Sequence, residues 1–195
     1  MLRDSRLRGN DTRALRYSLG RRQGLIPDPF DRDNETRVQW VESADWEYRR
    51  EFKLASSVLG NSHIELVAAG LDTFATILVN GQKVAETDNM FRSWRFDIKP
   101  FVRPGGNELV IRFDSPVKRA AALEAKAPHG LPGRSPRVRK APYQFGWDWG
   151  PRLVTSGVWR PLVIEAWDIA RVGEVELSQD FIQMNSVLVR TQINV

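Results

Sequence analysis

The sequence predicts an all-β fold with one short helix, and three observations support this class. Between residues 46 and 113, short runs rich in β-branched and aromatic residues alternate with turn residues such as glycine, proline and asparagine. Asn80-Gly81 separates two of these runs, and this dipeptide favours a hairpin because a type I′ turn needs positive φ at both central residues. A single stretch, residues 117–127, has a composition typical of a helix.

The predicted strands follow one another at short intervals. They lie at residues 47–53, 63–68, 73–79, 82–86, 96–98 and 108–113. A turn containing two glycines and an asparagine, at residues 103–107, separates the last two. Nothing along the chain alternates strand with helix in the way that a parallel α/β sheet requires. The pattern therefore favours antiparallel sheets joined by tight turns.

The predicted helix has clear start and stop signals. Ser115 is a suitable N-cap, and Pro116 stands at the first helical position, where a missing N–H costs nothing. Pro128 and Gly130 end the helix. Residues 134–140 follow as a basic loop with three arginines and one lysine, which is typical of a solvated loop but also of a segment that frames a binding site or a neighbouring domain.

The last part of the chain predicts a closing strand and the start of a second β unit. Residues 158–167 read as a long strand, and Pro161 within it indicates an edge or a bulge because proline cannot donate to a ladder. Residues 172–177 and 187–189 alternate like two further strands. Two strands cannot close a sandwich of about seven. The chain is therefore expected to stop inside this second unit.

Composition and charge exclude several classes of protein. The chain has 195 residues and no cysteine, so disulfide frameworks and thiolate metal sites are excluded, and its two histidines lie far apart. No apolar run approaches the ~20 residues of a membrane helix. The entire net charge of +5 lies in residues 1–23, which hold seven arginines and two aspartates, whereas the rest of the chain is neutral. A nucleic-acid-binding domain would carry the excess on its folded part.

Residues 1–23 are predicted to be a disordered, arginine-rich leader. They show neither helical nor strand periodicity. They also contain no apolar core and no small-residue cleavage pattern of a secretory signal, so a cytoplasmic location is expected.

One stretch, residues 143–151, has the composition of a sugar-binding surface. It places Tyr143, Phe145, Trp147 and Trp149 around the single carboxylate of Asp148. A sugar can stack its C–H face on an aromatic ring while its hydroxyls donate to a carboxylate. The alternative is that both tryptophans are core residues of a strand with the aspartate pointing outward.

Several separated motifs, in the same order, resemble the N-terminal domain of β-mannosidases of glycoside hydrolase family 2. They lie at residues 24–30, 38–48, 70–76, 88–92 and 145–161, and the resemblance covers most of residues 24–195. It implies a galactose-binding-like jelly-roll sandwich at residues 24–169, followed at residues 170–195 by the first strands of an incomplete immunoglobulin-like domain. Residues 1–23 depart from the family pattern, which suggests that unrelated sequence has replaced its usual first strand.

The resemblance also implies an activity, hydrolysis of terminal β-D-mannose residues by a retaining exo-β-mannosidase. Both catalytic glutamates of such enzymes lie on a (β/α)₈ barrel, for which this chain is too short. The family's acid/base glutamate follows an asparagine, but Asn34-Glu35 and Asn107-Glu108 stand in turn or loop contexts and are expected to be coincidental. We therefore expect no catalytic residue, no cofactor and no metal in this chain.

Asp148 and Trp147 are the predicted substrate-binding residues. In the family, the aspartate that matches Asp148 binds hydroxyls of the terminal mannose, and the tryptophan before it lines the pocket. Trp149 is expected to pack inward, and so are the tryptophans elsewhere in the chain, which are assigned to the core or to an interface: Trp40, Trp46, Trp94, Trp159 and Trp167. Residues 89–92 are assigned a structural role. The expected partners are a β-mannoside or mannooligosaccharide substrate and the missing (β/α)₈ barrel, with neither nucleic acid nor membrane.

Two alternatives to this enzyme fragment stay open. The chain could be a stand-alone carbohydrate-binding module, in which case it would bind mannosides without help and lose that binding when Asp148 is replaced. It could also be the remnant of a gene, with no function. A fragment, by contrast, should bind little sugar on its own because most of the pocket would lie on the barrel.

Overall fold

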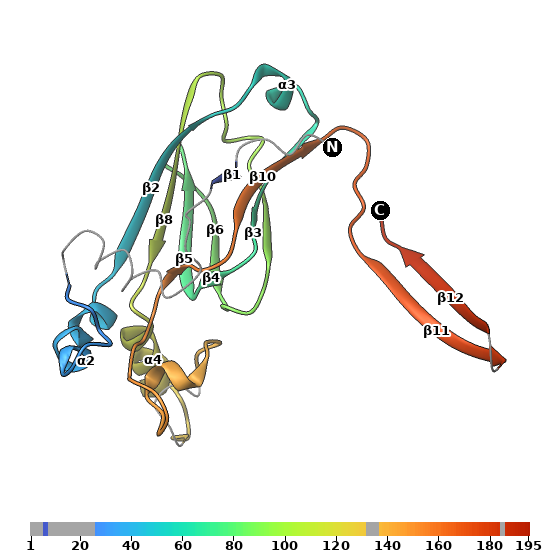
Figure 1. The fold of residues 1–195 in the computed structure, drawn as a ribbon. Helices are drawn as coiled ribbons and strands as arrows, with labels where there is room; N and C mark the ends of the chain where they lie inside the picture. Colours follow the sequence, from blue (N-terminus) through green and yellow to red (C-terminus); the bar gives the residue numbers. More distant parts are fainter. Residues whose placement is uncertain (1–5, 8–25, 132–136, 184–185) are drawn as a thin grey trace.

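The computed structural model describes residues 6–7, 26–131, 137–183 and 186–195. Two four-stranded antiparallel sheets face each other and form a β-sandwich (Figure 1). The strands of the first sheet follow the order β1 (Arg6–Leu7), β10 (Leu162–Trp167), β3 (His63–Ala68) and β7 (Trp94–Asp97). Those of the second follow the order β2 (Trp46–Lys53), β8 (Gly106–Phe113), β5 (Phe74–Val79) and β6 (Gln82–Asp88). The predicted all-β jelly-roll class is therefore confirmed.

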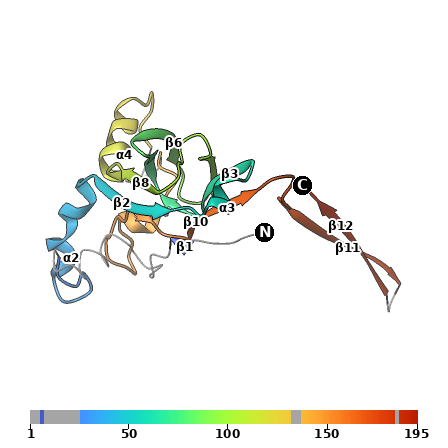
Figure 2. The ribbon, with the colours of Figure 1, turned by 90° about the horizontal axis from the view of Figure 1, so that it is seen from above.

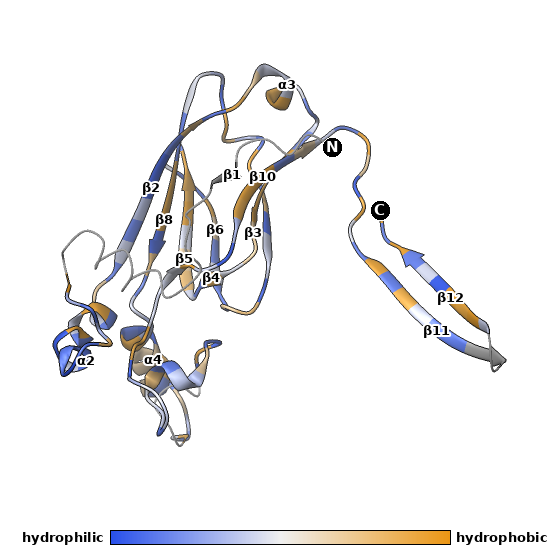
Figure 3. Ribbon diagram, in the orientation of Figure 1, coloured by the Kyte–Doolittle hydropathy of each residue, from blue (hydrophilic) through white to orange (hydrophobic). Residues whose placement is uncertain are grey.

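The core lies between the two sheets because their strands alternate inward apolar and outward polar residues. In β3, Ile64, Leu66 and Ala68 are buried while the residues between them are half-buried. Ile77 of β5 and Phe113 of β8 face them from the other sheet as part of the same cluster. Figure 3 shows the contrast between the largely hydrophobic β10 and the mostly hydrophilic edge strand β2. This period-two pattern is what fixes the register of each strand.

The Asn80-Gly81 turn has the predicted geometry. Asn80 and Gly81 have φ values of 51° and 80°, and they join β5 to β6. The Asn80 side chain also donates to the Phe101 carbonyl and accepts from the amide of Glu108, at 2.7 Å and 2.9 Å. The turn residue therefore ties the hairpin to the neighbouring strand β8.

The predicted helix is α4 (Pro116–Ala125), and its cap is also the predicted one. The Ser115 hydroxyl accepts the amide of Lys118 at 3.2 Å and donates to the carbonyl of Glu42. Ala120 of the helix packs in a small cluster with Phe74 and Val138. Four short helical segments in the described residues were not predicted: α2 (Asn34–Arg37), η1 (Gln39–Ser43), α3 (Ser56–Leu59) and η2 (Pro142–Phe145).

The predicted closing strand is divided around Pro161 into two strands of different sheets, where an edge or a bulge was expected. Its first part is β9 (Gly157–Val158), which pairs with β4 (Leu71–Asp72), and its second part is β10. β10 lies between β1 and β3, so the two residues of the leader that the structure describes pair with the sandwich. The rest of the predicted disordered leader lies outside the described residues.

Position 157 requires a glycine because of its backbone conformation and because of the space around its Cα. Its φ is 142°, and a Cβ placed there would lie 2.6 Å from the Tyr48 hydroxyl oxygen. The Tyr48 ring in turn packs edge-on against Phe113, with 5.4 Å between the ring centroids. A side chain at position 157 therefore has neither an unstrained backbone nor free space.

We expect Gly157→Ala to lower the free energy of unfolding by about 2 kcal/mol or more, because backbone strain and displacement of Tyr48 add together. Gly106→Ala is the matched control, since nothing lies within 4 Å of a Cβ built at Gly106. That substitution should leave stability unchanged or raise it slightly. Urea denaturation of the three proteins measures the difference; equal midpoints for the two variants would contradict the assignment.

The end of the chain forms a separate hairpin of β11 (Val175–Gln183) and β12 (Ser186–Ile193), where two strands were predicted. Figure 2 shows it extending away from the sandwich. Its described side chains are exposed, including Leu177 at 68% and Ile193 at 54%. Within the described segments, no helix is long and apolar enough to cross a membrane.

Candidate functional site

The aromatic stretch forms a loop at the end of the sandwich that also carries α2 and α4 (Figure 1). It begins with a 3₁₀ turn, η2 (Pro142–Phe145), and then bends at Gly146, whose φ is 106°. A single antiparallel bridge joins Trp147 to Gly150. The loop therefore has no strand periodicity, and adjacent side chains need not alternate between core and solvent.

Both tryptophans of the loop are exposed. Trp147 is 56% exposed and Trp149 is 70% exposed. The prediction that Trp149 packs inward is wrong, and so is the alternative in which both rings belong to the core. The reason is the bend at Gly146, which replaces the expected strand by a turn. The Trp149 ring instead lies beside Tyr143, with 5.7 Å between centroids.

Asp148 is exposed at the tip of the same turn. Within the described part of the chain, no hydrogen bond or ion pair engages its carboxylate. An ionised carboxylate only accepts hydrogen bonds, and its two oxygens can receive two hydroxyl donors side by side. The loop thus presents a free acceptor between two accessible indole rings, which is the chemistry that a sugar requires.

The C-terminal side of the loop is anchored by Arg152. Its guanidinium donates to the Phe145 carbonyl at 2.9 Å and forms an ion pair with Glu42, while its backbone N–H donates to Glu35. Phe145 itself is only 5% exposed. These contacts connect the loop to η1 and α2. Glu35 lies in the short helix α2 and not in a turn or loop as predicted, and its carboxylate accepts a backbone N–H, which is a structural contact.

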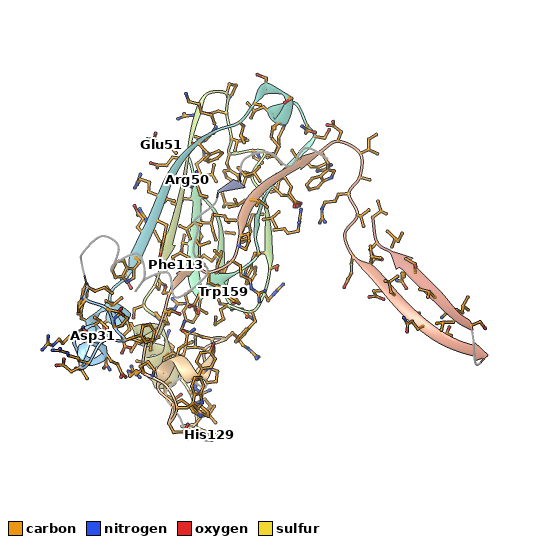
Figure 4. The ribbon with its side chains drawn as sticks, viewed as in Figure 1. Asp31, Arg50, Glu51, Phe113, His129 and Trp159 are labelled. Atoms are coloured by element: carbon orange, nitrogen blue, oxygen red, sulfur yellow. The ribbon has the colours of Figure 1, made fainter. Side chains whose placement is uncertain are left out.

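Glu108, the second glutamate that follows an asparagine, is also occupied by a structural contact. It lies in β8 and pairs with Arg49 of β2 across the second sheet, at 2.5 Å. Glu108 pairs in register with Glu51 of β2. Figure 4 shows Glu51 far from the end of the sandwich that carries His129. Neither glutamate therefore has the setting of a catalytic acid.

The N-terminal side of the loop is anchored by a buried polar cluster. Lys140 is fully buried, and its ammonium binds both carboxylate oxygens of Asp72 at 2.5 Å. The Thr155 hydroxyl lies 2.6 Å from Asp72 Oδ2 and 2.7 Å from Gln144 Oε1. We refer to Asp72, Lys140, Gln144 and Thr155 as the buried cluster, in which Asp72 and Lys140 are buried and Gln144 and Thr155 are half-buried. It joins β4, the basic loop, η2 and the segment after the aromatic turn.

The described part of the basic loop is not simply solvated. Arg137 binds the Glu124 carboxylate of α4 at 2.7 Å, and the hydrogen bond from Arg137 holds the pKa of Glu124 below its usual value. Lys140 is buried. Only Arg139 among the described basic residues of this loop is exposed. The expectation of a solvated loop is therefore wrong for residues 137 and 140, whereas Arg134 lies outside the described residues.

The remaining tryptophans divide into two groups. Trp46, Trp94, Trp159 and Trp167 are partly buried, in agreement with packing roles. Trp40 is 53% exposed, which contradicts a place in the core. Residues 89–92 have the expected structural role in part, because the Met90 carbonyl accepts the indole N–H of Trp159 and the Met90 sulfur accepts the amide of Ala141. Phe91 is exposed.

No cluster of three or more metal-ligating side chains occurs among the residues that the structure describes. His63 stacks on Trp167, and His129 is exposed in a loop. The sequence analysis did not identify the buried cluster. A lysine next to three arginines in a basic loop gives no signal that it is buried, and its partner Asp72 lies 68 residues earlier.

Fold and loop together define a β-sandwich domain that exposes an aromatic loop with one carboxylate at its end. Residues 19–160 match the family model described as the glycosyl hydrolase 2 galactose-binding domain-like family, and the chain belongs to this family. Beta-mannosidase B from Thermothelomyces thermophilus is 44% identical over 151 residues, which are 74% of this chain and 18% of that protein. Beta-mannosidase from Bos taurus is 35% identical over 76% of this chain and 18% of its own length.

Solved structures agree with these relatives. The β-D-mannosidase from Dictyoglomus thermophilum superimposes with a TM-score of 0.86 at 43% identity, covering 89% of this chain and 22% of that one. An exo-chitosanase from Amycolatopsis orientalis has a TM-score of 0.64 at 22% identity, which shows the shared fold alone. The chain thus spans about a fifth of the length of the relatives that it matches.

Proposed function

We propose that this chain is the N-terminal part of a retaining exo-β-mannosidase and supplies a substrate contact, not the catalytic groups. The exposed carboxylate of Asp148 between exposed indole rings is the observation that carries the proposal. The β-mannosidases that resemble the chain are about five times as long as the matched region. The (β/α)₈ barrel with both catalytic glutamates would belong to that further length.

Asp148 would accept hydrogen bonds from two hydroxyls of the terminal mannose, and Trp147 would line the pocket. A bidentate carboxylate acceptor discriminates the orientation of neighbouring hydroxyls because a misdirected hydroxyl leaves the charge without a donor. Glu35 and Glu108 hold structural contacts. Hydrolysis would therefore depend on residues outside this chain. The cytoplasmic location stays a prediction.

A stand-alone carbohydrate-binding module is the second candidate, and the accessible faces of Trp147 and Trp149 favour it. A module of this kind uses exposed rings as stacking platforms and needs no barrel. The two functions differ in one measurable property. A module binds its sugar unaided, whereas a part of an exo-enzyme contributes one side of a pocket.

We expect the isolated chain to bind mannose or mannobiose with a Kd above about 1 mM and to release no product from a chromogenic β-mannoside. Isothermal titration and an absorbance assay measure these two properties, with Asp148→Ala as the specificity control for any binding. Micromolar binding that Asp148→Ala abolishes would establish the module instead. Hydrolysis by a preparation free of host enzyme would overturn both candidates.

A further inference from the structure

The buried cluster has a place in the fold that packing of the sandwich does not explain. Lys140 and Asp72 have side-chain exposures of 0% and 3%, and burying two charges costs more than burying apolar residues of the same volume. The cluster is polar and flanks the aromatic loop in sequence: Lys140 precedes the loop, Gln144 lies in η2 at its start, and Thr155 follows it.

The hydrogen bonds of the cluster converge on Thr155. Its hydroxyl oxygen accepts a hydrogen bond from the Lys140 ammonium at 3.2 Å, and its single hydrogen can be donated to either of two nearby acceptors, Asp72 Oδ2 or Gln144 Oε1. Its backbone N–H also donates to Gln144 Oε1, at 3.2 Å. Thr155 therefore connects the buried ion pair to η2, the segment that begins the aromatic loop.

The rest of the loop makes few contacts of its own. From Gly146 to Gly150 it has one bridge and one hydrogen bond from the Gly146 amide to the Tyr143 carbonyl, at 3.1 Å. Trp147, Asp148 and Trp149 are all exposed. A segment with exposed side chains and few backbone hydrogen bonds opens easily unless its ends are fixed. Here Gln144 fixes one end and Arg152 fixes the other.

We propose that the buried cluster positions the aromatic loop, with Thr155 and Gln144 as the positioning residues for Asp148. The buried ion pair of Lys140 and Asp72 holds the Thr155 side chain in place. Thr155 in turn hydrogen-bonds Gln144 and so fixes the start of the aromatic loop. This inference rests on the proposed function insofar as Asp148 is the sugar contact. The order of the loop, however, can be measured without any sugar.

Thr155→Val tests the proposal because it removes the hydroxyl and keeps the shape of the side chain. Amide hydrogen exchange of the full chain is followed by mass spectrometry in peptides that cover residues 143–151. We expect the hydrogen-bonded amides there, those of Gln144 and Gly146, to exchange about tenfold faster, the effect of losing one hydrogen bond that restrains the loop. Thr155→Ser restores the hydroxyl and should restore slow exchange. Gln144→Met removes the acceptor of both the Thr155 hydroxyl and the Thr155 backbone N–H, so it should accelerate exchange at least as much as Thr155→Val.

Asn61→Leu is the matched control. Asn61 is half-buried like Thr155, and its amide donates to the Ser57 and Val58 carbonyls at 2.6 Å and 3.1 Å, so its replacement also removes side-chain hydrogen bonds. It follows α3, at the opposite end of the sandwich from the aromatic loop (Figure 1), and should leave exchange in residues 143–151 unchanged. Equal exchange of the loop in wild type and Thr155→Val would overturn the proposal, and so would equal acceleration by Asn61→Leu.

A failure of the proposed function would appear differently. In that case Asp148→Ala would not alter sugar recognition, yet Thr155→Val would still accelerate exchange of the loop. If the inference fails and the function holds, Asp148→Ala weakens sugar recognition while the loop exchanges equally in all the Thr155 variants. The two measurements therefore separate the role of the loop from the role of the residues beneath it.

Discussion

Asp148→Ala should lower kcat/KM for a β-mannoside by at least about 100-fold in an enzyme that contains this domain. Two charge-assisted hydrogen bonds to substrate hydroxyls contribute about 1.5–3 kcal/mol each, and their loss corresponds to this factor or more. A chimera provides the enzyme: this chain replaces the matching portion of the β-D-mannosidase from Dictyoglomus thermophilum, to which it is 43% identical. Steady-state kinetics with a chromogenic β-mannoside give the ratio.

Two further variants make the measurement specific. Asp148→Asn keeps the shape and one acceptor but loses the charge, so it should fall between wild type and Asp148→Ala. Glu51→Ala removes another exposed carboxylate, which lies on β2 away from the aromatic loop (Figure 4), and should leave kcat/KM unchanged. A chimera in which Asp148→Ala retains full kcat/KM would show that the carboxylate does not contact the substrate.

Lys140→Met should produce the largest loss of stability in this chain. The substitution keeps the length of the side chain and leaves the Asp72 carboxylate buried without its cation, a situation that costs about 3–5 kcal/mol. For a protein of this size, the melting temperature should fall by roughly 10 °C. Differential scanning calorimetry and urea denaturation both measure the change.

The double variant Lys140→Met/Asp72→Asn should recover much of this loss because it removes the stranded charge as well. Lys83→Met is the control for loss of a lysine ion pair at the surface: Lys83 and Glu86 are 57% and 63% exposed, and their pair should be worth less than about 1 kcal/mol. If the double variant is no more stable than Lys140→Met alone, the buried charge of Asp72 is not the source of the instability.

Much of the fold follows from local sequence signals. The strands of both sheets alternate with a period of two, Asn80-Gly81 allows one kind of turn, and Ser115-Pro116 defines the start of a helix in residues that are adjacent in sequence. Each of these signals acts over a few residues. The sequence predicted them for that reason, and the structure confirms them.

The candidate site was predicted only in its outer part. Trp147 and Asp148 stand out because aromatic and acidic residues alternate there, but the sequence could not show that Gly146 bends the chain and exposes Trp149 as well. The residues that hold the loop in place could not be predicted from the sequence. Asp72 and Lys140 are 68 residues apart, and no local pattern distinguishes a charge that folding buries from one that stays at the surface.

Strand β10 separates the aromatic loop from the terminal hairpin. It pairs with β3 over six residues, from Leu162 to Trp167, and spans roughly 20 Å at about 3.3 Å per residue. The loop precedes this strand and the hairpin follows it, so the two leave opposite ends of the sandwich (Figure 1). A polypeptide that continued from the hairpin would have to return along the length of β10 to reach Asp148, and the proposed pocket would need a partner with at least that reach.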